Sequence, residues 1–445
     1  CENEFNLNTR FAPEIYQEIV PIFQNQGKFS FTPEGVVVDY LVKMKQFKSS
    51  ELFSSLLSKN ELTENMLRDL TVSISKFHKD ATKTPDFFGI EDIKMLFSDN
   101  FELLTKSGWP TAEIEALVRH AILANESLLR TRQKTSVKYL HGDLHLGNIC
   151  LYQGSPTPFD GIEFNKAYAC CDVWADIAFL IMDLLYRDRS DLAYVVINEY
   201  LEQTDDYQGL PLLALYIAYR ASVRAKIAAL SSLPHNQDQG KTEVANYLQL
   251  IRKVLSQGFR FGLAIGGLSG TGKSTLGRIF ASKLCAIHIR SDAVRKHLAQ
   301  VPLNQHATNT FYTPEFSARV YSEVFVRASV AINSGYSIII DAAFLDPSER
   351  KNCELLFAKH KKVFHGIWCV VSENTALRRI NSRHSDISDA SVQVYKKQLE
   401  LNLGKIEWHK LDCEASPHAV AETAIQFLNL SPQLTFSMDK AHHEQ

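Results

Sequence analysis

One segment of the sequence, Gly267 to Ser274, limits the possible folds more than any other. It reads Gly-Leu-Ser-Gly-Thr-Gly-Lys-Ser and fits the pattern G-x-x-x-x-G-K-[S/T] completely. A loop of this kind needs a buried strand before it and a helix after it. A compact apolar run, Phe259–Ile265, precedes the loop, and apolar residues at helical spacing follow it. The sequence therefore predicts a strand, a phosphate-binding loop and a helix in direct succession.

The same part of the chain alternates apolar runs with helical stretches. The further strand candidates are Ala286–Ile289, Tyr336–Ile340 and Val363–Val371. Alternation of this kind is typical of βαβ units, which build a parallel sheet. We therefore predict an α/β domain over residues 258–430, followed by a tail over residues 431–445.

The predicted loop has the chemistry of a triphosphate site. Its glycines let the backbone turn successive N–H groups toward phosphates, and the dipole of the following helix adds positive potential. Lys273 would reach the β- and γ-phosphates, and the Ser274 hydroxyl would take a position on Mg²⁺. We expect ATP and Mg²⁺ as cofactors. The predicted contacts come from one stretch of the loop: Gly267, Ser269, Gly270, Thr271, Gly272, Lys273, Ser274 and Thr275.

Three other polar positions are candidates for the same site. Asp341 ends an apolar run, where a carboxylate would support Mg²⁺ at the carboxyl edge of the sheet, or would simply cap a turn. Asp292 would orient or deprotonate a hydroxyl and Arg295 would hold an acid group, although an N-cap and an exposed helix arginine would look the same. A basic helical stretch would form a lid over transferring charge, or a solvated face: Arg378, Arg379 and Arg383, of which we take Arg383 as catalytic.

These residues resemble the small P-loop kinases often described as AAA-type ATP-binding domains, similar to gluconate and polynucleotide-end kinases. The likeness covers about residues 259–430 and includes the loop, the Ser291–Lys296 segment and the Asp341–Arg350 stretch. The resemblance implies ATP-dependent phosphorylation of a small hydroxyl compound or of a nucleic-acid end.

A second constellation, His141-Gly-Asp-Leu-His-Leu-Gly-Asn148, lies in the first half of the chain. The spacing from Asp143 to Asn148 equals that between the base and the metal ligand in the kinase loop H-R-D-x-x-x-x-N. Asp143 would align the proton of a substrate hydroxyl while Asn148 holds Mg²⁺. His141 would brace the loop by hydrogen bonding, and His145 would have either a packing or a catalytic role.

A second metal carboxylate is expected after this loop, and two residues offer one. Asp160 and Glu163 lie three positions apart in a segment predicted as a strand, so their side chains would point to opposite faces. Both are therefore not expected on one ion. The spacing from Ile-Glu163-Phe to the later Asp176 resembles that of the Ile-Asp-Phe segment in kinase-like small-molecule enzymes, and this resemblance favours Glu163 over Asp160.

Residues 1–255 resemble the aminoglycoside phosphotransferase family, which has a protein-kinase-like α+β fold. The matching motifs lie within residues 141–184, including Asp176 in a helix over Asp172–Leu184. The whole chain resembles bifunctional bacterial proteins that join such a domain to an AAA-type P-loop kinase. The family's Gly-rich loop and strand lysine have no counterpart here. Either they lie upstream, which the start at Cys1 favours, or this domain is an impaired kinase without them. We predict this domain over residues 1–257, lacking the start of its N-lobe.

The composition limits the classes of partner and the cellular compartment that we expect for this chain. Lys and Arg number 48 against 50 Asp and Glu, which argues against a nucleic-acid partner, and the longest apolar run is too short to span a bilayer. Eight scattered cysteines suit buried thiols in a reducing compartment, so we expect a cytoplasmic protein. The sequence thus predicts a phosphotransferase for a small hydroxyl substrate, with the first domain as a second phosphotransferase or a substrate-binding module. The alternatives are a nucleic-acid 5′-end kinase and an ATP-hydrolysing switch; the acceptor and the oligomeric state stay open.

Overall fold

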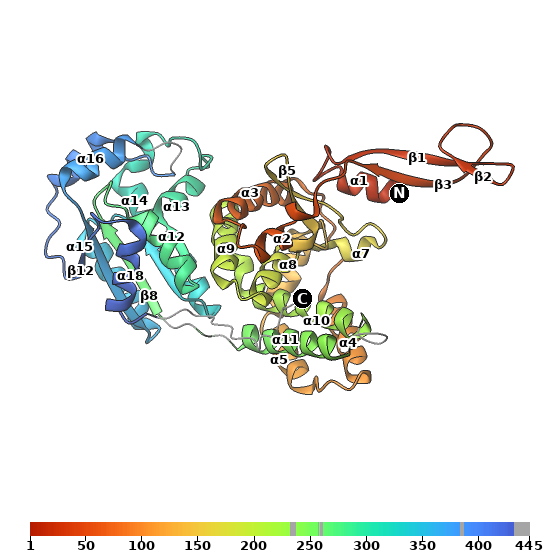
Figure 1. Cartoon of the computed structure of the whole chain (residues 1–445). Helices are drawn as coiled ribbons and strands as arrows, with labels where there is room; N and C mark the ends of the chain where they lie inside the picture. The colour runs from red at the N-terminus through yellow and green to blue at the C-terminus, as the bar shows by residue number, and fades with distance from the viewer. Residues whose placement is uncertain (232–236, 257, 259–260, 383–386, 431–445) are drawn as a thin grey trace. The chain divides into compact units, whose positions relative to one another are not determined.

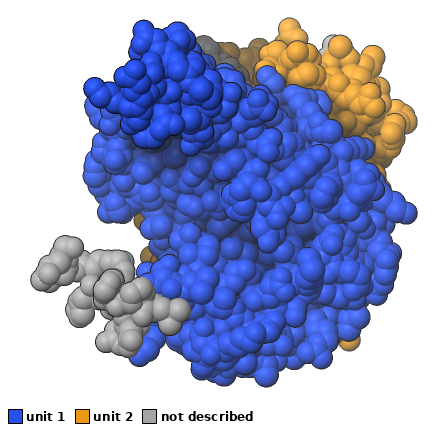
Figure 2. All heavy atoms as spheres, turned by 90° about the vertical axis from the view of Figure 1, so that its right-hand side faces the viewer, with its two compact units in different colours: residues 1–187, 212–255, 438–445 blue, residues 188–211, 256–437 orange. Residues whose placement is uncertain are grey.

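The computed structural model describes residues 1–231, 237–256, 258, 261–382 and 387–430. Within these residues the chain forms two compact units (Figure 2). The first comprises Cys1–Arg187 and Leu212–Leu255, and the second comprises Asp188–Pro211 and the described residues from 256 to 430. In the part of the chain that is described, no helix combines the length and the apolar character needed to cross a membrane.

The first unit opens with α1 (Glu2–Asn8) and a three-stranded antiparallel sheet (Figure 1). Its strand order is β2 (Lys28–Ser30), β1 (Tyr16–Asn25), β3 (Val36–Met44). The turn between β1 and β2 places Gln26 and Gly27 at φ angles of 50° and 80°. Positive φ at both turn residues matches the right-handed twist of the flanking strands, which makes a tight hairpin.

Helices and short hairpins make up the rest of the first unit. The helices are α2 (Phe53–Ser58), α3 (Glu64–Asp80), α4 (Ile90–Lys106), α5 (Ala112–Ala124), α6 (Glu126–Thr135), α7 (Lys166–Ala169), α8 (Val173–Tyr186), α10 (Leu213–Ser231) and α11 (Gln237–Leu255). The strands form two antiparallel pairs, β4 (Val137–Tyr139) with β7 (Cys170–Asp172) and β5 (Ile149–Tyr152) with β6 (Ser155–Pro158). Helix α8 is buried from Val173 to Leu185, so it is the central element of this unit.

The second unit is built on a five-stranded sheet with parallel neighbours throughout. Its order is β12 (His409–Asp412), β11 (Val363–Val370), β8 (Phe261–Gly267), β10 (Ile338–Asp341), β9 (Ile287–Arg290). The helices after these strands are α12 (Lys273–Leu284), α13 (Ser291–Leu298), α14 (Pro314–Asn333), α15 (Pro347–Lys359), α16 (Glu373–Asn381), α17 (Val392–Leu399) and α18 (Pro417–Phe427). These pairings confirm the predicted parallel sheet, and every residue of its central strand β8 is buried, as is typical of parallel sheets.

One helix of the second unit comes from the first half of the sequence. Helix α9 (Ser190–Thr204) lies along β9, the edge strand of the sheet. The Asn198 side chain donates from Nδ2 to the Ala286 carbonyl at 2.9 Å, and its Oδ1 accepts the His288 N–H at 2.7 Å. Asn198 therefore pairs with the free edge of β9 as a neighbouring strand would. The predicted first domain, 1–257, included this segment, whereas contacts assign residues 188–211 to the second unit.

Candidate functional site

The P-loop joins the end of β8 to the start of α12, and its shape depends on glycine. Gly267, Gly270 and Gly272 have φ angles of 139°, 80° and 95°, which L-residues with a Cβ rarely adopt. A Cβ at Gly267 would lie 2.6 Å from the Cys369 carbonyl oxygen, and one at Gly270 would lie 2.7 Å from the Ala376 carbonyl oxygen. The loop can therefore curl under β11 and α16 only with glycine at these positions.

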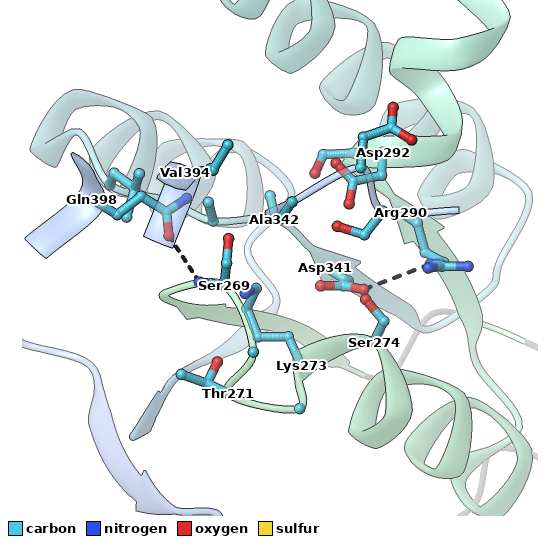
Figure 3. A pocket seen from close by; sticks show the side chains of 18 of the residues that line it. Ser269, Thr271, Lys273, Ser274, Arg290, Asp292, Asp341, Ala342, Val394 and Gln398 are labelled. Atoms are coloured by element: carbon cyan, nitrogen blue, oxygen red, sulfur yellow. Dashed lines mark hydrogen bonds and ion pairs between the residues drawn. The ribbon is translucent and has the colours of Figure 1, made fainter. Parts of the chain in front are cut away.

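Two side chains already bond to the P-loop backbone (Figure 3). Lys273 Nζ donates to the Leu268 carbonyl at 2.8 Å, which folds the lysine over its own loop. The Ser269 N–H donates to Gln398 Oε1, from α17, at 2.8 Å. Gln398 thus accepts a hydrogen bond from a loop N–H of the kind that donates to phosphate oxygens in P-loops. No local signal in the sequence marks Gln398, because α17 is separated from the loop by more than a hundred residues.

A cavity of about 940 Å³ opens over the loop. Its floor includes all residues from Ser269 to Thr275, so seven of the eight predicted loop contacts line it, while Gly267 ends the strand beneath. Asp292, Asp341 and Arg295 line the same cavity. Residues predicted separately for phosphate binding, metal binding and acceptor binding therefore meet in one place.

Asp341 ends β10 at the carboxyl edge of the sheet, as predicted, and is 4% exposed. Its Oδ2 lies 3.6 Å from His288 Nε2 and 3.8 Å from Arg290 Nε. Burial raises the pKa of Asp341, but the neighbouring His288 and the charges of Arg290 and Lys273 outweigh it and bring the pKa to about 2. The carboxylate is therefore ionised at neutral pH.

The donors at this edge fit Mg²⁺ bound together with a nucleotide. Figure 3 shows the Ser274 side chain next to the Asp341 carboxylate, so a hydroxyl and an ionised carboxylate share one corner of the cavity. Among the described residues, no group of three or more His, Cys, Asp or Glu side chains could hold a metal. Mg²⁺ is commonly bound by one or two protein oxygens plus substrate phosphates and water, which is the arrangement these two residues allow.

The Ser291–Lys296 segment forms the first turns of α13 beside the cavity. Asp292 lies in the first turn, is half-buried and lines the cavity. Arg295 is only 8% exposed: its Nη1 donates to the Phe311 carbonyl at 2.6 Å, and its guanidinium lies 4.7 Å from the centre of the Tyr312 ring. The alternative reading of Arg295 as an exposed helix residue is therefore wrong.

The arginine-rich stretch places one guanidinium at the loop. Arg379, on α16, lines the cavity and donates to the Cys413 carbonyl at 2.8 Å and to the Thr271 carbonyl at 3.4 Å. Its neighbour Arg378 is exposed. Arg383, the predicted catalytic arginine, lies outside the described residues. Among the described arginines of this stretch, Arg379 holds the position that a charge-stabilising group needs.

In the first unit, the predicted loop at His141–Asn148 brings its polar residues together. Asn148 Nδ2 donates to Asp143 Oδ2 at 2.9 Å, and His145 Nε2 lies 3.5 Å from the same oxygen. Burial raises the pKa of Asp143, but the hydrogen bond and charge of His145 outweigh it and lower the pKa overall. His141 Nε2 donates to the Phe159 carbonyl at 3.0 Å while its Nδ1 accepts the Asp143 N–H at 3.3 Å, which is the bracing role predicted for it.

Two aspartates of α8 accept hydrogen bonds from backbone N–H groups of this loop. The Gly142 N–H donates to Asp176 Oδ1 at 2.8 Å, and the Leu146 N–H donates to Asp183 Oδ2 at 3.1 Å. Because the two aspartates are seven residues apart, they lie on one face of the helix, two turns from each other. Asp176 is itself bonded to His78 Nε2 at 3.1 Å. The sequence indicated Asp176, but Asp183 looked only like an interruption of an apolar run.

The predicted strand over Asp160 and Glu163 is not present. Residues 159–164 belong to no strand or helix, and Asp160 takes a left-handed φ of 60° with its N–H bonded to the Tyr16 hydroxyl at 3.1 Å. The strand-face argument is therefore wrong, because a loop does not alternate its side chains. Burial and the negative charges of Asp143 and Glu163 raise the pKa of Asp160. Asp160 and Glu163 thus lie close enough for their charges to repel each other, and the charge of Asp143 also acts on Asp160.

With this fold and this loop, the second unit is a P-loop domain of the AAA type. A family model described as "AAA domain" matches residues 263–404. Uncharacterized proteins of Mycobacterium tuberculosis and Mycobacterium bovis are 27% identical to this chain over 412 residues, covering 88% of the chain and 80% of each relative.

Solved structures of several kinases resemble part of the chain. A gluconokinase from Sinorhizobium meliloti is 18% identical, covers 39% of this chain and 94% of its own, and has a TM-score of 0.29. The Mycobacterium tuberculosis APS kinase CysC, in complex with AMPPNP and APS, is 16% identical, covers 39% of this chain and 99% of its own, and has a TM-score of 0.30.

Proposed function

We propose that the chain is an ATP-dependent phosphotransferase that transfers the terminal phosphate of MgATP to a hydroxyl group of a small molecule. One observation carries the proposal: the P-loop, Asp341 and Asp292 line one cavity of about 940 Å³. This volume accommodates a nucleotide together with a small acceptor. An arrangement that places a phosphate cradle, a metal carboxylate and a candidate base around one space suits phosphoryl transfer.

Each group has a specific role in the proposed reaction. The loop N–H groups and Lys273 would neutralise the β- and γ-phosphates, and Arg379, joined by Arg383, would balance the charge on the transferring phosphoryl group. Asp292 would align the acceptor hydroxyl and accept its proton. Ser274 and Asp341 would hold Mg²⁺, which would supply positive charge to offset that of the phosphates when bound.

For the first unit we propose a second phosphotransfer site of the protein-kinase type, as in aminoglycoside phosphotransferases. The contact between Asn148 and Asp143, at 2.9 Å, supports a base and a metal ligand on one loop. Asn148 Nδ2 also donates to the Asp160 carbonyl at 3.4 Å, so Asp160 lies beside the proposed metal ligand, and this contact supports Asp160 rather than Glu163 as the second metal carboxylate. The alternative is a module that only binds the substrate of the P-loop unit.

The proposal takes the chain as a cytoplasmic protein without a nucleic-acid partner. Seven of the eight cysteines are buried free thiols, which suits a reducing compartment. The net charge of −2 leaves no general surplus of Lys and Arg for a phosphate backbone.

An acceptor screen with ATP labelled in its terminal phosphate tests the proposal. Sugars, sugar acids, amino alcohols and 5′-hydroxyl oligonucleotides would be offered to wild type and to three variants: Lys273→Ala, Asp292→Asn and Asp143→Ala. We expect a small hydroxyl compound to take up label, and Lys273→Ala to lower that transfer by about 10²–10³-fold because the phosphates lose their main cation.

The labelled products and the variants together distinguish the proposed function from its alternatives. Label on oligonucleotides alone would make the chain a nucleic-acid end kinase, and ATP hydrolysis without any labelled acceptor would make it a switch. If Lys273→Ala and Asp143→Ala each abolish transfer to a different acceptor, both units are phosphotransferases. If Asp143→Ala changes only the KM of the acceptor phosphorylated by the P-loop unit, the first unit is a binding module.

A further inference from the structure

Helix α9 brings a buried carboxylate to the metal corner of the P-loop unit. Arg290 Nη1 donates to both oxygens of Glu202 at 3.2 Å, while Arg290 Nε lies 3.8 Å from Asp341 Oδ2. The side chains of Arg290, Asp341 and Glu202 are 1%, 4% and 13% exposed. One buried guanidinium is therefore shared between Asp341, a carboxylate that lines the cavity (Figure 3), and Glu202, a carboxylate that is not part of the cavity lining.

Glu202 is held in this position by contacts from α12 and α13. The His297 ring donates from Nε2 to the Glu202 carbonyl at 2.8 Å, and Arg278 lies 3.9 Å from Glu202 Oε1. Burial raises the pKa of Glu202, but the charges of Arg290, Arg278 and His288 outweigh it and lower the pKa overall. Glu202 is thus an anion at neutral pH, held at a distance that lets it compete with Asp341 for Arg290.

This competition affects the proposed metal site because Mg²⁺ and Arg290 would both bind the carboxylate oxygens of Asp341. A guanidinium that bonds fully to a buried carboxylate occupies its lone pairs and offsets its charge. Charge–charge interactions are strong at this depth, because buried pairs are poorly screened. By accepting Arg290 on both oxygens, Glu202 leaves Asp341 with a weaker contact to the arginine and with more of its charge available to a cation.

We propose that Glu202 is a positioning residue for the metal site: it holds Arg290 off Asp341 and so sets the Mg²⁺ requirement of the P-loop unit. This inference rests on the proposed function, since it assumes that the loop binds nucleotide with Mg²⁺. Glu202 lies outside the matched segment 263–404, in the stretch 188–211 that precedes the P-loop by about sixty residues. The P-loop unit therefore depends, for its metal chemistry, on a helix embedded in the sequence of the first half.

The test measures binding of a fluorescent ADP analogue to the full chain while Mg²⁺ is titrated. For Glu202→Gln we expect the Mg²⁺ concentration at half-effect to rise about tenfold, and the affinity without metal to stay within about twofold of wild type. The matched control is Glu323→Gln, which removes a partner of another buried arginine, Arg327, at 2.8 Å. We expect the control to leave the Mg²⁺ midpoint unchanged.

A double variant tests the role of the arginine. In Glu202→Gln/Arg290→Gln no guanidinium is left to engage Asp341, so we expect the Mg²⁺ midpoint to return to within about threefold of wild type. If Glu202→Gln does not fold, as circular dichroism would show, Glu202→Asp takes its place. Retracting the carboxylate by one methylene loosens its hold on Arg290 and is expected to raise the midpoint about threefold.

The outcomes distinguish this inference from the function on which it rests. Absence of any Mg²⁺-dependent nucleotide binding in wild type would overturn the proposed function. A Mg²⁺-dependent wild type with an unshifted Glu202→Gln, or with an unshifted Glu202→Asp where that variant replaces it, would overturn only the role of Glu202. A double variant that stays as impaired as Glu202→Gln would do the same, because Arg290 would then not carry the effect.

Discussion

The contact between Asn198 and the edge of the sheet gives a sharp prediction about stability. Asn198→Ala removes the donor to the Ala286 carbonyl and the acceptor for the His288 N–H. Ala286 is fully buried and His288 is 6% exposed, so water cannot easily replace the lost partner. A buried polar group left without a partner costs about 1–3 kcal/mol. Two such groups predict a loss of about 2–6 kcal/mol in the free energy of unfolding of the second unit.

Hydrogen exchange measures this effect at the place where it arises. Asn198→Ala should speed exchange in a peptide that covers β9 by about 30-fold or more, since about 1.4 kcal/mol corresponds to a factor of ten. Ser329→Ala is the matched control, because its hydroxyl bonds only to the Phe325 carbonyl one turn back in α14. Urea unfolding followed by circular dichroism would give the total change.

The reasoning would be refuted by a β9 peptide whose exchange is unchanged in Asn198→Ala. It would also be refuted if Asn198→Ala and Ser329→Ala lowered the free energy of unfolding equally. Either result would mean that α9 does not protect the sheet edge through this side chain.

Two further predictions concern one site in each unit. Arg379→Ala should lower phosphate transfer by about 10–100-fold, because its guanidinium lies at the loop, whereas Arg378→Ala, at an exposed position, should change the rate less than twofold; kcat and KM for ATP distinguish the two. Burial raises the pKa of Asp176, but the hydrogen bond and charge of His78 outweigh it, so the folded-state pKa lies below the usual 3.8. The ionised carboxylate therefore stabilises the folded state above pH 3.8, and this contribution is lost as the pH falls through the folded-state pKa. Urea unfolding between pH 5 and pH 2 should show a smaller pH dependence in Asp176→Asn, and an identical dependence would contradict the assignment.

The P-loop and its sheet could be predicted from the sequence because their determinants are local. Gly267, Gly270 and Gly272 supply the positive φ angles that this loop requires. The apolar run before them forms the buried strand β8. Asp341 and Asp292 follow strands directly, so the parallel order of the sheet brings them to one edge. The loop at Asp143–Asn148 was found for the same reason, since its two polar residues contact each other across five positions.

The strand predicted over Asp160 and Glu163 failed because nothing local enforces a strand there. The segment is held by single side-chain contacts from the start of the chain: the Gly161 N–H donates to Asn8 Oδ1, and the Asp160 N–H donates to the Tyr16 hydroxyl. These partners lie about 150 residues earlier in the chain. A segment held by distant side chains shows no strand or helix pattern of its own.

What only the tertiary structure decided is which unit α9 serves and what its polar face does. Asn198 and Glu202 are four residues apart on one helical face, a spacing that in sequence looks like any solvated surface. Docked on β9, the same two residues cap a sheet edge and hold Arg290. The sequence alone determined the phosphate loop, because backbone conformation at glycine is a short-range property. The docking of α9 was decided by burial and ion pairing between segments some 90 residues apart, which no short-range pattern encodes.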